Sequence, residues 1–359
     1  MPKKIDWNEV DELYRRMIVE FSACESGSRL PSFPELRSRF GCSRKVLECV
    51  LERLEAEKRI RIFPRRGIFW EKCRSSSCRI AVFRTDWPQE YAMCLEKRLE
   101  EYFSKLPGVS FEVVLLPVES VVNDYLKNLS PEFCDIAIVT CNFTHFDQKD
   151  VGRLLSELRV PVIFLENHIV CRPVNLIDSK PEYSGMLAAD YLYRRGHRRI
   201  AVVNAERLDR DICLERELDG FTSYLALHGI KPEIIDCRHP SQASSFGAVE
   251  DKGKKYLEEH GIHFSAVFAS SVETARGFCN VLRDHGLSVP DDVSIIANSE
   301  VPSAAHTVPP LTTVARDFDG YAKTAVKMVE MIRQGIQPGI IRVPSYIVER
   351  ESVKDLCQK

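Results

Sequence analysis

The feature that most constrains the fold is an alternation of short apolar runs with amphipathic segments through most of the chain. Seven runs have the length of a β-strand: residues 80–83, 111–116, 135–139, 160–165, 200–203, 266–269 and 293–297. Continuous apolar strands separated by helical segments are typical of parallel sheets with helices on both faces. Because residues 79–359 carry more of this pattern than one sheet holds, we expect two α/β lobes.

The N-terminal part has a different, mostly helical pattern. Apolar residues within 8–24 recur every three or four positions, which predicts a core-facing helix. Ser32 and Glu35 have the spacing of a capping box, so a second helix is expected to run to about Phe40, before Gly41.

A third helix follows after a turn of only a few residues. Ser43 can cap it, and its buried face is predicted to contain Val46, Leu47, Val50, Leu51 and Leu54. Two stretches, 59–63 and 67–70, then alternate like strands around a basic tip at 64–66. Two tightly joined helices followed by a hairpin predict a winged helix-turn-helix, whose second helix reads the DNA major groove.

Charge and composition divide the chain in the same place. Residues 1–74 hold 17 Lys and Arg against 12 Asp and Glu, while the rest holds 33 against 40. A basic module on an acidic body favours a polyanionic partner for the module. Residues 71–78 are polar and serine-rich, so we expect a DNA-binding domain at 1–72, a linker at 73–78 and a larger domain at 79–359.

Several classes of protein are disfavoured by the sequence. The thirteen cysteines are scattered without a CxxC pair or a Cys/His metal spacing, which indicates reduced thiols and no metal site or other cofactor. The N-terminus lacks the apolar segment of a secretory signal, and the longest apolar runs are too short to span a bilayer. We therefore expect a cytoplasmic protein that does not contact the membrane.

The phrases LPSFPELRSRFGCSRKVLECVLERLEAEKRI and RRGIFW resemble the GntR family of winged-helix regulators. The resemblance implies that DNA is contacted by the start of the recognition helix and by the wing tip, at Ser43, Arg44, Lys45, Arg65, Arg66 and Gly67. Two positions depart from the family pattern, because arginines are usual where this chain has Pro34 and Glu48. A changed operator preference, weak DNA binding and a winged helix that binds protein all remain open.

From residue 178 onward the chain resembles the sensor domain of the LacI and galactose repressor family. The resemblance rests on GMLAADYLYRRGHRRIAVV, DGFTSYLALHGI, GLSVPDDVSIIA, PPLTTV and RVPSYIVERESV. It implies a two-lobed, periplasmic-binding-protein-like fold, a homodimer, a double-stranded DNA operator and a small effector such as a sugar or derivative. The combined architecture is similar to that of the arabinose-responsive repressors.

Candidate effector residues lie in loops beyond the carboxyl ends of the strands, where ligands bind in such folds. The loop after the first strand contains Asp86, Trp87 and Tyr91, which suit stacking on a sugar or other polar ring. Packing of the two aromatic side chains onto the core is an equal alternative.

The other effector positions implied by the LacI resemblance are altered. An arginine is usual where this chain has Glu217, with Arg216 one residue away. An Asn-Asp pair is replaced by Ser271-Val272, and an aspartate by Ser299. A sugar in the usual pose would lose charge-assisted hydrogen bonds. Glu217 and Glu300 suit a positive or donor-rich ligand, and a vestigial pocket is the alternative.

Rival functions have weaker support in the sequence. GxSxG, GxxxxGK[ST] and GxGxxG are all absent, so we expect no enzyme, and His197 is assigned a packing role. A solute receptor would need the secretory signal that the N-terminus lacks. The sequence thus predicts a transcription regulator, expected to be a repressor, with a regulator that senses no ligand as the alternative.

Overall fold

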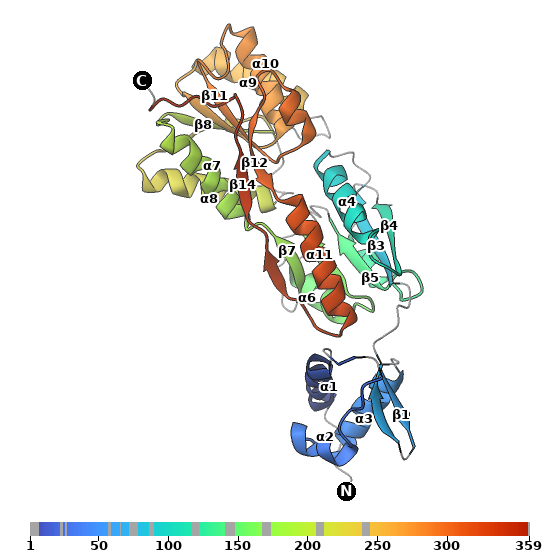
Figure 1. The fold of residues 1–359 in the computed structure, drawn as a ribbon. Coiled ribbons are helices and arrows are strands. Elements are labelled where there is room, and N and C mark those ends of the chain that lie inside the picture. Colours follow the sequence, from blue (N-terminus) through green and yellow to red (C-terminus); the bar gives the residue numbers. More distant parts are fainter. Residues whose placement is uncertain are drawn as a thin grey trace.

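The computed structural model contains a small N-terminal domain and two lobes, each built on a six-stranded sheet (Figure 1). The structure describes residues 7–21, 24–25, 27–56, 59–64, 66–71, 78–85, 90–116, 122–140, 148–166, 174–205, 212–238 and 245–357.

The described part of the N-terminal domain has three helices and a hairpin: α1 (Trp7–Phe21), α2 (Phe33–Phe40), α3 (Arg44–Ala56), β1 (Ile60–Phe63) and β2 (Gly67–Trp70). The apolar residues predicted on α3 are all buried, and they share one core with α1, α2 and Trp70. Glu35 accepts a hydrogen bond from the Ser32 backbone N–H at 2.7 Å, and Gly41 ends α2 with a φ of 64°. The predicted winged helix-turn-helix is confirmed.

The first lobe, called the N-lobe, has a fully parallel sheet in the order β13-β7-β6-β5-β3-β4. Its strands are β3 (Cys78–Thr85), β4 (Val109–Leu116), β5 (Ile136–Val139), β6 (Val162–Leu165), β7 (Asn175–Asp178) and β13 (Ile340–Arg342). Its helices are α4 (Glu90–Phe103), α5 (Val122–Lys127), α6 (Gln148–Glu157) and α11 (Phe318–Arg333). Helices α4 and α11 pack on one face of the sheet, and α5 and α6 on the other.

The second lobe, called the C-lobe, has the strand order β14-β12-β11-β10-β8-β9. Its strands are β8 (Ile200–Asn204), β9 (Glu233–Asp236), β10 (Ala266–Ala269), β11 (Ser294–Asn298), β12 (Thr312–Arg316) and β14 (Ser345–Val348). Its helices are α7 (Pro181–Arg194), α8 (Ile212–Leu227), α9 (Ser245–His260) and α10 (Val272–Asp284), with a 3-10 turn at Pro302–His306. Helices α7 and α8 cover one face, and α9 and α10 the other.

All seven predicted strands are present, and five further strands complete the sheets. The additional strands are β7, β9, β12, β13 and β14, each three to five residues long and each containing a polar or charged residue. They therefore lack the continuous apolar run on which the prediction depended. The parallel sheets are confirmed, with two local differences: the additional strand β14 pairs antiparallel with β12, and the edge strand β4 is only partly covered.

Within the described residues, the chain crosses between the lobes at residues 178–181, 316–318 and 342–345. These crossings, called the hinge here, lie side by side between the two sheets (Figure 1). The Asp178 carboxylate pairs with the Arg342 guanidinium, so two of the crossings are joined directly.

Candidate functional site

The start of α3 is exposed, although the helix behind it is anchored in the core. The Ser43 hydroxyl accepts a hydrogen bond from the Val46 backbone N–H at 3.3 Å, which fixes the first turn. Arg44 and Lys45 extend from this turn into solvent. The first residues of a recognition helix are those that reach base edges in DNA-bound helix-turn-helix domains.

Glu48, which departs from the expected arginine, forms an ion pair with Arg44. Arg44 Nε lies 2.8 Å from Glu48 Oε1, one helical turn away, and this hydrogen bond raises the pKa of Arg44. The Arg44 side chain is 74% exposed and that of Glu48 is 41% exposed, so solvent reaches both. Glu48 therefore competes with any phosphate for the Arg44 guanidinium.

The wing carries further positive charge. Arg66 is exposed beside Gly67, whose φ of 112° favours glycine, while Arg65 lies outside the described residues. The side chain of Arg29 also reaches the wing, because a Cβ on Gly67 would lie 3.0 Å from Arg29 Nε. The sequence did not single out Arg29, which lies before α2 and reaches the wing only through the tertiary fold.

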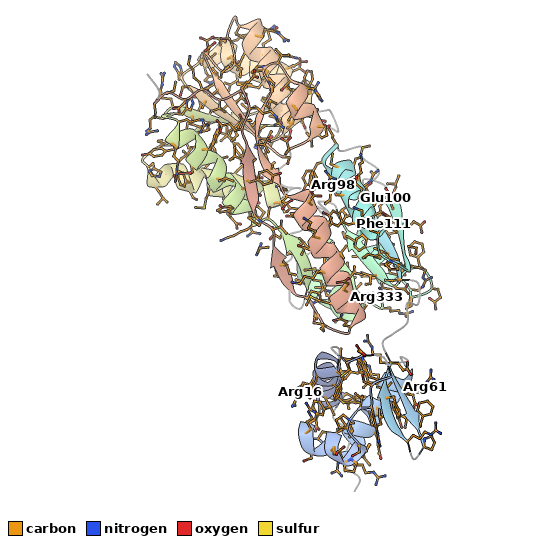
Figure 2. All side chains as sticks on the ribbon, viewed as in Figure 1. Arg16, Arg61, Arg98, Glu100, Phe111 and Arg333 are labelled. Atoms are coloured by element: carbon orange, nitrogen blue, oxygen red, sulfur yellow. The ribbon has the colours of Figure 1, made fainter. Side chains whose placement is uncertain are left out.

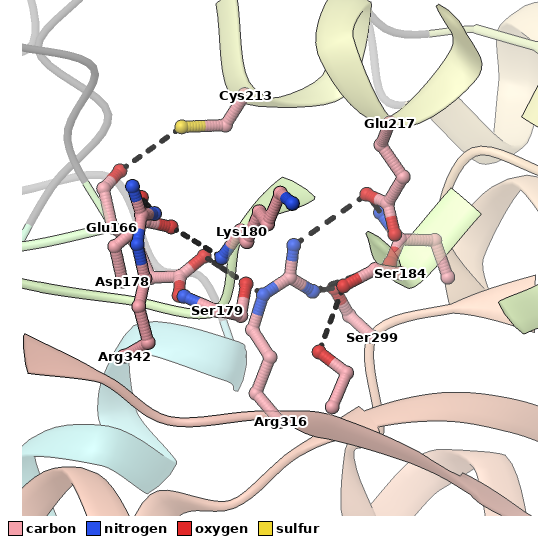
Figure 3. Close-up of polar contacts among 12 residues, drawn as sticks. Glu166, Asp178, Ser179, Lys180, Ser184, Cys213, Glu217, Ser299, Arg316 and Arg342 are labelled. Atoms are coloured by element: carbon pink, nitrogen blue, oxygen red, sulfur yellow. Dashed lines mark hydrogen bonds and ion pairs between the residues drawn. The ribbon is translucent and has the colours of Figure 1, made fainter. Parts of the chain in front are cut away.

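A second candidate site lies between the lobes, centred on Arg316 at the end of β12 (Figure 3). Arg316 Nε donates to Glu166 Oε2 at 2.9 Å. Its Nη1 donates to Asn298 Oδ1 at 3.2 Å and to Ser299 Oγ at 3.0 Å, and its Nη2 lies 3.5 Å from Glu217 Oε2. Glu166 follows β6 in the N-lobe and the other four belong to the C-lobe, so these five residues, called the hinge network, join the lobes.

Backbone conformation also distinguishes this region. Among the described residues, the non-glycine residues with positive φ are Glu166 (52°), Lys180 (60°) and Ser299 (67°). Two belong to the hinge network, and the third follows Ser179, whose backbone N–H donates to Glu166 Oε1 at 3.1 Å. Such backbone conformations are unfavourable for side-chain-bearing residues and cluster at functional sites.

Glu217 is placed by two glycines at the contact of α7 and α8. A Cβ on Gly185 would lie 1.8 Å from the Glu217 carbonyl oxygen, and one on Gly220 would lie 2.1 Å from the Glu182 carbonyl oxygen. Only glycine allows the two helices to approach this closely. The close contact places the Glu217 side chain, which is fully buried, toward Arg316.

Burial and charge oppose each other in the hinge network. Burial raises the pKa of Glu166, and the attraction of Arg316 only partly offsets it. Burial lowers the pKa of Arg316, but Glu166 and Glu217 outweigh it and hold that pKa well above its usual value. Arg316 therefore remains a cation enclosed by acidic and polar side chains.

Tyr91 lies against this network from the N-lobe. It was expected in a loop, but α4 begins at Glu90, so Tyr91 lies in the first helical turn. Its ring packs against Phe318 with 5.1 Å between centroids, and the Arg316 guanidinium lies 5.6 Å from the Tyr91 ring centroid. Its buried hydroxyl has no hydrogen-bond partner among the described residues, and burial raises its pKa well above the usual value.

Three further predicted effector residues have hydrogen-bond or ion-pair partners outside the hinge network. Arg216 Nε donates to Glu182 at 2.6 Å, and the Ser271 hydroxyl caps α10 by accepting from the Thr274 N–H at 3.1 Å. Glu300 pairs with Arg350. Asp86 and Trp87 lie outside the described residues, so their predicted roles stay predictions.

The sequence reasoning missed Glu166, Asn298 and Arg316. Each stands at or directly after the carboxyl end of a strand, where the ligand-site rule points. Glu166 and Asn298 directly follow runs that were predicted as strands, so the ligand-site rule could have identified them. Arg316 ends a short polar strand that was not predicted, so the rule could not be applied to it.

No group of three or more potential metal ligands occurs among the described residues. In the same part of the chain, no helix combines the length and apolar character needed to cross a bilayer.

Both parts of the chain are similar to known protein families. Residues 9–69 match the family "Bacterial regulatory proteins, gntR family", and residues 189–353 match "Periplasmic binding protein-like domain". The HTH-type transcriptional repressor PurR of Photobacterium profundum is 25% identical over 243 residues, covering 65% of this chain and 68% of that protein. The ribose operon repressor of Escherichia coli (strain K12) is 24% identical over 236 residues, covering 65% and 69%.

The chain is a DNA-binding transcription regulator. The regulator joins a GntR-type helix-turn-helix domain to a periplasmic-binding-protein-like sensor domain, is repressor-like, and is not an enzyme. A solved structure of the lac repressor dimer bound to operator and an anti-inducer has a TM-score of 0.67 and 22% identity, covering 78% of this regulator and 95% of that chain. At this identity the similarity shows the fold alone. The resemblance to arabinose-responsive repressors stays a prediction.

Proposed function

We propose that the regulator represses transcription as a homodimer bound to a two-fold operator, and that a small polar molecule held between the lobes changes this binding. The observation that carries the DNA-binding part is the exposed basic start of α3 beside a basic wing. The similar lac repressor fold, solved as a dimer on operator DNA, supports the dimeric arrangement. In this proposal residues 1–72 bind DNA and residues 73–78 form the linker. Residues 79–359 bind the effector and form the dimer contact.

The proposed DNA contacts are divided between two grooves. Ser43, Arg44 and Lys45 approach the major groove from the start of α3, and the wing tip at 65–67 enters the minor groove. Arg29, which reaches Gly67 from outside the hairpin, adds a third arginine at the wing tip beside Arg65 and Arg66. Because Glu48 binds Arg44 in the free protein, the first base contact requires this exposed ion pair to open.

The test of DNA binding is a site selection from random duplex DNA with the full chain, followed by affinity measurements over a salt series. We expect a two-fold symmetric site and an affinity that falls steeply as salt rises, since lysines and arginines release counterions from DNA. We expect Arg44→Ala to weaken this binding. Lys255→Ala, which removes an exposed cation from α9, should leave it unchanged. Recovery of no enriched sequence would instead favour the protein-binding alternative for the winged helix.

The proposed effector position is the hinge network with Tyr91. The supporting observations are its position between the lobes, its left-handed residues and the enclosed Tyr91 hydroxyl. Glu217 and Ser299 are retained from the sequence prediction, and Glu166, Asn298 and Arg316 are added. A ligand that bridges the lobes here would change the hinge, and through it the DNA-binding geometry.

One observation favours a regulator that senses no ligand. Arg316 already supplies hydrogen bonds to Glu166, Asn298 and Ser299, as a bound ligand would. Melting temperatures measured with neutral sugars, amino sugars and amines separate the two candidates, because a ligand that binds only the folded state raises the melting temperature. A rise that Ser299→Ala reduces supports the sensor, and no rise with any class supports the ligand-independent regulator.

A further inference from the structure

Helix α11 connects the hinge to the DNA-binding domain. Its first residue follows Asp317, the residue after Arg316, and the Asp317 carboxylate caps the helix by accepting from the Gly320 N–H at 2.9 Å. From there α11 extends along the N-lobe toward α1 and the wing (Figure 1). One continuous element therefore begins at the hinge network and ends beside the N-terminal domain.

The far end of α11 contacts that domain directly. The guanidinium of Arg59, just before β1, donates to the carbonyl oxygen of Arg333, the last residue of α11. Two residues later, a Cβ on Gly335 would lie 3.4 Å from the Tyr14 ring and 3.8 Å from Ile18 on α1. Figure 2 shows Arg333 at the end of the N-lobe that faces the N-terminal domain.

The Arg59 contact has the chemistry of a helix C-terminal cap. The last carbonyls of a helix lack partners within the helix, and the helix dipole makes this end attractive to a cation. Arg59 satisfies one such carbonyl from a separate domain, so the bond depends on how the two domains are positioned.

The packing of α11 in the N-lobe makes this helix suitable to transmit a movement of that lobe. Its buried face, with Tyr321, Ala325 and Met328, packs into the N-lobe core against α4 and the sheet. The helix must therefore move with the N-lobe when the hinge changes. A DNA-binding domain attached only through residues 73–78 would not have to follow.

We propose that Arg59 and α11 form a docking contact through which the state of the hinge network reaches the DNA-binding domain. This inference rests on the proposed function for the identity of the hinge as the sensing region. Arg59 acts in it as a positioning residue.

The test is hydrogen exchange of the full chain without DNA, followed by mass spectrometry. Arg59→Ala should raise exchange about tenfold in the last turn of α11 and in α1, the factor expected for the loss of a hydrogen bond from a charged group. Arg61→Ala is the matched control, because Arg61 lies on the adjacent strand and pairs with Glu71 in its own domain. Equal exchange in both variants would overturn the docking contact.

A second pair of variants tests transmission from the hinge. Glu166→Gln removes a charge from the hinge network, and Glu300→Gln removes one from a pair with Arg350 that lies within the C-lobe. We expect Glu166→Gln alone to change exchange in α1, and Arg59→Ala to abolish that change in the double variant. A response of Asp317–Gly320 that never reaches α1 would contradict the proposal.

The inference and the proposed function fail separately. Exchange is measured without DNA, so it decides the docking contact even when no operator is recovered. Operator binding by the wild-type chain, measured in parallel, decides the DNA-binding function.

Discussion

The DNA-binding domain and the hinge both pair an arginine with glutamate, but the two pairs differ strongly in their exposure to water. The Arg44 and Glu48 side chains are 74% and 41% exposed, whereas those of Arg316 and Glu166 are each 6% exposed. Exposed pairs exchange partners readily because water and salt screen them. Buried pairs hold a geometry, because separating them leaves a charge without solvent.

This difference in exposure suits the two arginine–glutamate pairs to different roles. At the start of α3 the ion pair is replaceable, so phosphate or a base edge can take Glu48's place beside Arg44. At the hinge the pair joins two lobes whose sheets, over the residues that the structure describes, share no hydrogen-bonded strands. The first arrangement suits recognition of a partner, and the second suits control of a conformation.

The largest expected effect is at Arg316. Arg316→Leu leaves Glu166 and Glu217 buried without their shared cation, and breaking a buried pair in this way costs about 3–5 kcal/mol. Urea unfolding of the full chain measures the loss. Arg194→Leu, an exposed i,i+4 partner of Asp190, is the control and should leave the unfolding midpoint unchanged. Equal midpoints for the two variants would remove the distinction between the exposed and buried pairs.

The next effect concerns the glycine that places Glu217. Gly185→Ala sets a Cβ 1.8 Å from the Glu217 carbonyl oxygen, so α7 and α8 must separate, and overpacking of this kind costs about 1–3 kcal/mol. Gly253→Ala on α9 is the control, since its nearest neighbours would lie at 3.5 Å, an ordinary contact. A smaller loss at Gly185 than at Gly253, by urea unfolding, would show that the close helix contact does not hold Glu217.

Substitutions in the exposed DNA-binding surface should change DNA affinity and leave the stability of the fold unchanged. Arg66→Ala at the wing should weaken operator binding and lower the slope of affinity against salt by about 0.9, the contribution of one phosphate contact. Fluorescence anisotropy with the selected duplex over a salt series measures both quantities. An unchanged slope with unchanged affinity would place Arg66 outside the DNA interface.

A smaller effect of opposite sign is expected at Glu48. Glu48→Gln removes the carboxylate that holds Arg44, so operator affinity should rise severalfold while the melting temperature stays constant. The same anisotropy assay applies. A fall in affinity confined to one base position would instead assign Glu48 to direct readout of cytosine.

The smallest effect is a dependence of stability on pH. Burial raises the folded-state pKa of Glu166 above 4.5, so unfolding releases a proton in the window between the two pKa values. Stability from this group is therefore present at low pH and lost as pH rises through the folded-state pKa. Glu166→Gln should remove that decline in a pH series of melting temperatures, and an unchanged series would contradict the assignment.

His197 should affect stability in the opposite direction to Glu166 in the same pH series. Its ring nitrogens lie 3.0 Å from Ser265 Oγ and 3.1 Å from the Lys354 carbonyl oxygen, which agrees with a packing role. Burial lowers its pKa below 6.5, so its contribution is lost as pH falls below that value. His197→Gln should therefore change the acid side of the series, where the unfolded chain takes up the proton.

The comparison also explains how much was predictable from the sequence. Ser32, Glu35, Gly41 and Ser43 act on backbone groups within four residues, so local patterns predicted the helix-turn-helix closely. The hinge network joins Arg316 to Glu166, 150 positions away, across two lobes. No local pattern contains such a pairing, because chain topology alone brings the crossings together.

The altered effector positions show the same limit. The sequence showed that Glu217 replaces an expected arginine, yet it did not show that Arg316 supplies a guanidinium from another strand. Glu300 looked equivalent to Glu217, but Arg350 binds it within the C-lobe. Residue type alone therefore did not separate a group at the hinge from a group that braces one lobe.

The most direct test of the central claim, that the hinge controls DNA binding, is operator affinity of the wild-type chain, Glu166→Gln and Glu300→Gln on the same selected duplex. We predict that Glu166→Gln changes affinity by about fivefold or more, within the usual range of coupling between sites, while Glu300→Gln matches the wild type. Equal affinities for all three proteins, with all three folded, would show that the DNA-binding domain acts independently of the hinge.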